Sequence, residues 1–151
     1  MKSPGRRPAP VLPVPPPRRL YTADEANAVL PEVRTELERV RGHVSRAQEV
    51  RELLDDLEAY YGGDMASATQ AERDRHAALR GEASRLEAEI SEGVRGILDR
   101  GIEIKDLQRG LIDFYHDRAG TVVYLCWEHG EKRVLHWHPL ASGYAGRQPL
   151  P

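Results

Sequence analysis

The sequence contains one cysteine among 151 residues, so it offers no pair of thiols for an internal disulfide. A chain of this kind is typical of a reducing compartment, which predicts a cytoplasmic location. No stretch approaches the roughly 18 consecutive apolar residues that a membrane-spanning helix needs, so we expect no membrane partner. The formal net charge of −2 shows no basic excess. It therefore disfavours specific nucleic-acid binding.

Proline is distributed unevenly along the chain. Seven of the 11 prolines lie before residue 18, and the first 19 residues also contain five cationic residues and no acidic one. Because proline lacks an amide N–H and has a fixed φ, we expect residues 1–19 to form a disordered, basic, proline-rich tail. The rest of the chain then carries 17 cationic and 24 acidic residues and is acidic.

Apolar side chains recur at helical spacing after the tail. The sequence from Thr22 to Glu25 is a capping box, which predicts a helix that begins after Thr22. Pro31 either kinks this helix or begins a second one, and we favour a short first helix followed by a long one from Pro31. The apolar positions beyond it have the spacing of a coiled-coil seam, ending at Gly62 and Gly63: Val33, Leu37, Val40, Val44, Ala47, Val50, Leu54, Leu57 and Tyr61.

A second amphipathic helix is predicted over about 67–100, closed by Gly101 in the left-handed conformation. Its apolar seam is Ala68, Ala71, Leu79, Ala83, Leu86, Ile90, Val94 and Ile97. Gly81, Gly93 and Gly96 weaken a helix, and we expect them where the partner helix approaches closely.

The two predicted helices form an antiparallel hairpin over 20–101. Each seam covers the other, but a single long hairpin leaves its flanks exposed. We therefore expect a homodimer, as a four-helix bundle, or a protein partner bound through the hairpin.

The hydrophobic period changes from 3.6 to 2 after Gly101. Strands are predicted over 102–105, 111–116, 121–128 and 132–138, separated by turn residues. The fold class is therefore α+β: a long helical hairpin followed by a small antiparallel β-meander over 102–151 that packs on the helices and forms one domain with them.

Strand register follows from the sorting of side chains between the two faces of the sheet. We pair His116 with Thr121 across a four-residue turn, and Glu128 with Lys132 across a three-residue turn. One face is then apolar and packs on the helices: Ile112, Phe114, Val123, Leu125, Trp127, Leu135 and Trp137. The other face stays free and chemically mixed: Asp113, Tyr115, Tyr124, Cys126, His136 and His138.

The mixed face brings together a carboxylate, a thiol and two imidazoles. In the predicted register Tyr124 lies opposite His136, and Cys126 is diagonal to His136. Thiolate, imidazole and carboxylate are ligands of zinc and of iron, so Cys126, His136 and His138 are candidate metal ligands beside Asp113. The alternatives are an ordinary polar sheet face and a face that binds a small molecule or a partner. No nucleophile turn or oxyanion-hole motif identifies an enzyme.

The C-terminal segment contains an arginine between glycine-rich and proline-containing stretches. Arg147 can meet an anionic ligand, or it can form an ion pair with Asp113 or Glu131. The second interpretation is the simpler one.

Several segments together resemble an uncharacterised prokaryotic family, domain of unknown function 2203. They include the sequence from Tyr21 to Pro31, Leu125-Cys126-Trp127, Trp137-His138 and the sequence from Gly146 to Leu150, and the resemblance covers residues ~20–150. It implies a bacterial or archaeal cytosolic protein and no particular activity.

The resemblance also bears on the candidate site. The family pattern includes positions that match Asp113, Cys126, Trp127, Glu131, Trp137, His138 and Arg147. It does not require a histidine at the position of His136, which favours the other metal candidates. The candidate ligand-binding residues are Asp113, Tyr124, Glu131, Trp137 and Arg147.

Two hypotheses about function follow. The first is a non-enzymatic interaction or assembly protein that uses the helical hairpin. The second is a metal- or small-ligand-binding protein, with or without enzymatic activity, that uses the face of Asp113, Cys126 and His138.

Overall fold

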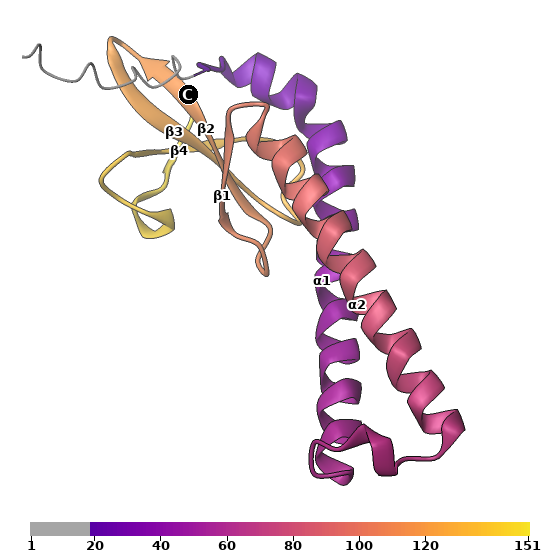
Figure 1. The fold of residues 1–151 in the computed structure, drawn as a ribbon. Helices are drawn as coiled ribbons and strands as arrows, with labels where there is room; N and C mark the ends of the chain where they lie inside the picture. Colours follow the sequence, from indigo (N-terminus) through magenta and orange to yellow (C-terminus); the bar gives the residue numbers. More distant parts are fainter. Residues whose placement is uncertain (1–18) are drawn as a thin grey trace, which may run out of the picture.

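The computed structural model describes residues 19–151, so the predicted tail lies outside the described residues except for Arg19. Two long helices precede a five-stranded antiparallel sheet in the order β1-β2-β3-β4-β5 (Figure 1). The elements are α1 (Ala23–Tyr60), η1 (Met65–Ser67), α2 (Gln70–Leu98), β1 (Ile102–Asp106), β2 (Leu111–Arg118), β3 (Thr121–Glu128), β4 (His136–Pro139), η2 (Tyr144–Gly146) and β5 (Gln148–Pro149). This arrangement confirms the predicted α+β fold class. No helix among the described residues is long and apolar enough to cross a membrane.

The N-terminus of α1 has the predicted cap. The Glu25 amide donates to Thr22 Oγ1 over 3.0 Å, and the Thr22 amide donates to Glu25 Oε1 over 3.3 Å. The favoured prediction that a second helix begins at Pro31 is wrong, because Pro31 lies inside one continuous helix. Its missing N–H removes a single intrahelical bond, while Leu30 and Val33 on either side are buried and hold both parts on the same core.

The two helices form the predicted hairpin. Gly62 and Gly63 have φ of +60° and +84° and turn the chain after α1, and Gly101, at +77°, follows α2 as predicted. Helix α2 begins at Gln70 rather than near residue 67, because Met65–Ser67 form a separate 3₁₀ turn. In Figure 1 the halves of α1 and α2 nearest this turn extend beyond the sheet.

The helices approach each other most closely at one of the three predicted glycines. A Cβ atom on Gly93 would overlap the Val40 side chain and come within 2.9 Å of Glu36 Oε1. The same prediction is wrong for Gly81 and Gly96, which have no described neighbour within 4 Å of such an atom.

Strands β2 and β3 pair in a register that differs from the predicted one by two residues. Arg118 pairs with Thr121 across a two-residue turn, so His116 lies opposite Val123. Both turn residues have positive φ, +51° for Ala119 and +89° for Gly120. An alanine seldom adopts this conformation, which is why the sequence favoured a longer turn. A shift of two residues leaves every side chain on its predicted face.

The connection from β3 to β4 is longer than predicted, because β4 begins only at His136. Val134 takes the buried place expected for Leu135, which is 48% exposed. Asn27 of α1 fixes this position: it donates from Nδ2 to Val134 O over 3.3 Å and accepts from the Val134 amide over 2.8 Å. An asparagine on a helix thus decides where the connection enters the core.

Most of the buried apolar side chains form one core between the sheet and the sheet-proximal parts of the helices. This core contains Tyr21, Ala26, Leu30, Val33, Leu37, Ile97, Ile102, Ile112, Phe114, Leu125, Trp127 and Val134. A smaller cluster of Val50, Leu79 and Leu86 lies farther along the hairpin. The main core covers one face of the sheet and leaves the polar residues on the other.

Candidate metal centre

The strand register arranges the polar face in two transverse rows. The first row runs through cross-strand partners from β1 to β4: Glu103, Asp113, Cys126 and His136. The second row runs from β2 to β4: Tyr115, Tyr124 and His138. The predicted neighbours on β4 are therefore wrong, since Cys126 lies opposite His136 and Tyr124 lies opposite His138. The connection between β3 and β4 shifts their pairing by two residues and keeps both histidines on this face.

The centre of this face is buried rather than free, which corrects the prediction. Asp113 and Cys126 are 1% exposed and His138 is 2% exposed. One potential ligand atom from each of these three residues lies within 4.8 Å of the other two. A carboxylate, a thiol and an imidazole therefore converge in surroundings that water does not reach.

Hydrogen-bond partners assign the proton on one nitrogen of His138. Nδ1 lies 2.9 Å from the carbonyl oxygen of Pro139, which can only accept, so Nδ1 carries a proton and donates it. Nε2 faces Asp113 Oδ2 at 3.1 Å. Nitrogen and oxygen share one proton across this contact, and a metal ion could replace that proton because both atoms are metal ligands.

Asp113 keeps one oxygen without a partner. Oδ1 is buried and has no hydrogen-bond partner of normal geometry among the described residues, although the Cys126 thiol lies near enough to interact with this carboxylate. Burial raises the pKa of Asp113 above its ordinary value, and the nearby His138 and Cys126 only partly oppose that rise. The orphaned oxygen lies on the side chain that already contacts His138.

The Cys126 thiol is held in its protonated form. Burial, and then the negative charge of Asp113, raise the pKa of Cys126 to about 12. In the metal-free chain this thiol is a poor nucleophile at neutral pH, because the thiolate is the reactive form. A bound cation would reverse this preference and stabilise the thiolate.

His136 contacts Arg147, whereas His138 contacts Asp113. Its Nδ1 lies 2.7 Å from Arg147 Nη2, which also contacts both carboxylate oxygens of Glu131 at 2.8 and 2.7 Å. The simpler prediction for Arg147, an ion pair with Glu131, is therefore confirmed. Since a guanidinium only donates, Nδ1 of His136 accepts this hydrogen bond, and the same nitrogen lies 3.5 Å from Glu131 Oε2.

A hydrogen-bonded cluster of two tyrosines borders the buried centre. Tyr124 donates to Glu103 over 2.9 Å, Tyr115 and Lys105 also bind this carboxylate, and the rings of Tyr124 and His138 are 5.3 Å apart. Burial opposes the charge on Glu103, but these three donors together hold the pKa of Glu103 below its ordinary value. Glu103 and Lys105 were not among the predicted site residues, although their alternation with Ile102 and Ile104 placed both on one face of a strand.

Trp137 lies apart from the other predicted ligand-binding residues. It packs against the main core on the opposite face of the sheet, with the Arg118 guanidinium 4.2 Å from the centre of its ring system. Asp113, Tyr124, Glu131 and Arg147 all lie on or beside the polar face.

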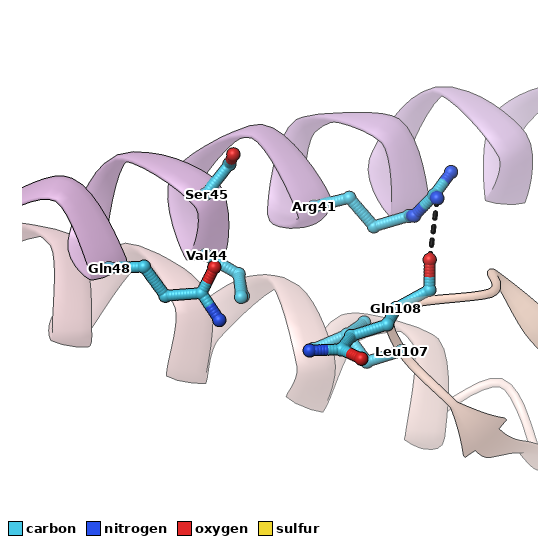
Figure 2. Close-up of a pocket in the computed structure, with 6 residues that line it drawn as sticks. All are labelled: Arg41, Val44, Ser45, Gln48, Leu107 and Gln108. Atoms are coloured by element: carbon cyan, nitrogen blue, oxygen red, sulfur yellow. Dashed lines mark hydrogen bonds between the residues drawn. The ribbon is translucent and has the colours of Figure 1, made fainter.

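A separate groove lies between α1 and the β1–β2 turn (Figure 2). It has a volume of about 300 Å³, and Arg41 at its edge donates to the carbonyl oxygen of Gln108 over 2.6 Å. Its lining is Arg41, Val44, Ser45, Gln48, Leu107 and Gln108. These side chains include no carboxylate, thiol or imidazole, so this groove offers no metal ligand of these types.

These features define an α+β protein in which a helical hairpin supports a sheet with a buried Asp/Cys/His cluster. The chain belongs to the family described as uncharacterized conserved protein (DUF2203), whose model matches residues 19–150. This match confirms the family resemblance seen in the sequence. Neither the comparison with curated proteins nor that with solved structures gives a match.

Proposed function

We propose that this protein binds a divalent transition metal ion through Asp113, Cys126 and His138, with zinc as the first candidate. The observation that carries the proposal is the buried Oδ1 of Asp113, which lacks a partner while thiol and imidazole ligand atoms lie within 4.8 Å. An unsatisfied buried polar atom costs about 1–3 kcal/mol, and a coordinated cation would remove this cost.

The second support is the orientation of His138. Histidines that bind metals through one ring nitrogen usually donate the other N–H to a carbonyl or carboxylate, and His138 Nδ1 faces Pro139 O in this way. A set of sulfur, nitrogen and oxygen ligands fits zinc, and iron is the alternative.

The test is metal analysis of the full chain purified without a tag, followed by zinc titration. We expect one zinc per wild-type chain and a loss of binding in Cys126→Ser, Asp113→Asn and His138→Ala. His43→Ala is the matched control, because His43 lies on the hairpin beside Glu89 and should leave binding unchanged. Absence of binding by the wild type, or equal binding by all variants, would overturn the proposal.

We propose, as a second function, assembly of two copies of the chain through the hairpin as a four-helix bundle. The smaller apolar cluster of the hairpin has three buried members, Val50, Leu79 and Leu86, while Ala47, Leu53, Leu54 and Ala83 packed against it stay partly exposed. Grooves of about 290 and 300 Å³ flank this cluster, and Leu53 lines one and Leu54 the other. Each groove has an apolar floor and side chains of both charge signs, which suits a second copy of the same surface.

Light scattering coupled to size exclusion tests this assembly. We expect a particle of twice the 17.0 kDa chain mass at micromolar concentration. Tyr60→Glu should shift it toward a monomer, because Tyr60 lines a groove and is 80% exposed, so its replacement leaves the fold intact. Leu98→Glu is the control, since Leu98 is also exposed but lies at the other end of α2. A wild-type monomer would rule out the assembly.

We also propose a cytoplasmic location. It is supported by the single cysteine, which is an unpaired, buried thiol that needs no oxidising compartment.

A further inference from the structure

The register places a fourth potential ligand directly beside the proposed metal site. Cys126 has Asp113 as its cross-strand partner on β2 and His136 as its partner on β4. Directly opposed residues on one sheet face have Cβ atoms about 4.5–5.5 Å apart, so their side chains can meet. The ring nitrogens of His136 lie outside the 4.8 Å cluster of Asp113, Cys126 and His138 while Arg147 holds Nδ1. Cys126 is thus flanked by ligand side chains on both sides, with His138 diagonal to it.

Three protein ligands leave a tetrahedral zinc ion one position short. A catalytic site keeps that position for water, whereas a structural site fills it with a side chain. At this site Asp113, Cys126 and His138 are all at most 2% exposed, so the surroundings exclude bulk water. A neighbouring side chain is the fitting occupant of the fourth position.

Arg147 occupies the ring nitrogen through which His136 accepts a hydrogen bond. Arg147 Nη2 lies 2.7 Å from His136 Nδ1, and Glu131 Oε2 lies 3.5 Å from the same nitrogen. Releasing this contact costs Arg147 little, because the same nitrogen keeps both oxygens of Glu131.

The Arg147 guanidinium is not fully hydrogen-bonded in its place beside His136. The Arg147 side chain is 10% exposed, yet its Nε is buried and has no hydrogen-bond partner among the described residues. A divalent cation next to Cys126 would also repel this guanidinium, and such repulsion is strong in surroundings of low polarity. Metal binding therefore favours displacement of Arg147 from the site.

We propose that His136 is the fourth metal ligand and that Arg147 is a latch which holds His136 until the metal ion binds. This proposal rests on the metal-binding function. Arg147 belongs to the C-terminal segment, where its amide donates to Tyr144 O and its guanidinium lies 4.6 Å from the Tyr144 ring centre. Metal binding thus releases Arg147 from His136 and loosens the turn over residues 144–147, while Glu131 and the pairing of β4 with β5 still hold the C-terminal segment.

Cobalt(II) absorption spectroscopy on the full chain tests the fourth ligand. We expect the wild type to show a thiolate charge-transfer band and the intense visible bands of a tetrahedral ion. His136→Ala should keep the charge-transfer band, lose the tetrahedral intensity and bind roughly tenfold or more weakly. His43→Ala should match the wild type. If His136→Ala gives the wild-type spectrum and affinity, His136 is not a ligand, while absence of a charge-transfer band in the wild type overturns the metal-binding function itself.

Hydrogen exchange and one arginine variant test the latch. We expect zinc to speed amide exchange within the turn over residues 144–147 of the wild type but not of His136→Ala. Arg147→Met should bind zinc several-fold more tightly, because the competitor for His136 is gone. Arg118→Met is the control, since Arg118 contacts Trp137 on the opposite face. Slower exchange with zinc, or weaker zinc binding by Arg147→Met, would overturn the latch.

Discussion

Burial changes the chemistry of individual side chains on the polar face. It raises the pKa of Asp113 and of Cys126, because surroundings of low polarity disfavour both charged forms. Glu103 has the opposite shift, because three hydrogen-bond donors outweigh its burial. Carboxylates on neighbouring strands therefore differ in acidity for reasons that a sequence does not contain.

Asp113→Asn tests whether the carboxylate is kept for function rather than for stability. A carboxylate with a raised pKa in the folded state binds its proton more tightly there than in the unfolded chain. Its contribution to stability therefore falls as pH rises from about 3.8, its ordinary pKa, through the raised value. We expect metal-free Asp113→Asn to gain stability relative to the wild type over this rise, measured by urea unfolding between pH 4 and pH 7.

The exposed residue Asp55 offers the control, Asp55→Asn, for which no such relative gain is expected. An asparagine at position 113 can still donate to His138 Nε2, so the fold should be retained. A loss of about 2 kcal/mol or more at pH 7 would show that the ionised carboxylate stabilises the fold, contrary to this expectation.

Residue patterns predicted the metal candidates only in part. The alternation of side chains on β2, β3 and β4 placed Asp113, Cys126, His136 and His138 on one face. The sequence did not indicate that His138 would bind Asp113 while His136 bound Arg147. That difference arises because the C-terminal segment folds back beside β4 and not beside β3.

At the scale of elements, sequence rules predicted correctly those features that depend on interactions between adjacent residues. The capping box of α1 and the glycine turn after it were both predicted, since each depends on a few adjacent residues. The rules failed at Pro31, where packing on the core keeps a single helix, and at Ala119, where strand pairing holds an alanine at φ +51°. In both places tertiary contacts outweigh a local preference of about 1–3 kcal/mol.

Gly93 and Gly81 give a matched test of helix packing. Both lie within α2, but only at Gly93 would an added Cβ overlap a neighbouring helix, at Val40. We expect Gly93→Ala to lower the free energy of unfolding by about 1–3 kcal/mol, the usual cost of overpacking. Gly81→Ala should raise it by about 0.5–1 kcal/mol through better helix propensity. Chemical denaturation measures both, and an equal gain in the two variants would show that the helices can move apart at no cost.

At the scale of the whole molecule, the two apolar clusters support different parts of the structure. The main core joins α1, α2 and the sheet and fixes the polar face, whereas the smaller cluster lies in the part of the hairpin that extends beyond the sheet (Figure 1). The proposed metal site and the proposed assembly surface are therefore separate. Tyr60→Glu should leave zinc binding unchanged, and Cys126→Ser should leave the oligomeric state unchanged, so each proposal can fail without the other.

The sequence by itself determined the fold class, the hairpin and the face on which each strand residue lies. Periodicity is sufficient for this, because side chains alternate along a strand and a shift of two residues preserves the faces. Only the tertiary structure decided that the polar face is buried and which side chain contacts which. Those features depend on the β3–β4 connection, which Asn27 on a distant helix anchors at Val134, and on the return of Arg147 to the sheet. Contacts between segments so far apart in the chain leave no periodic signal in the sequence.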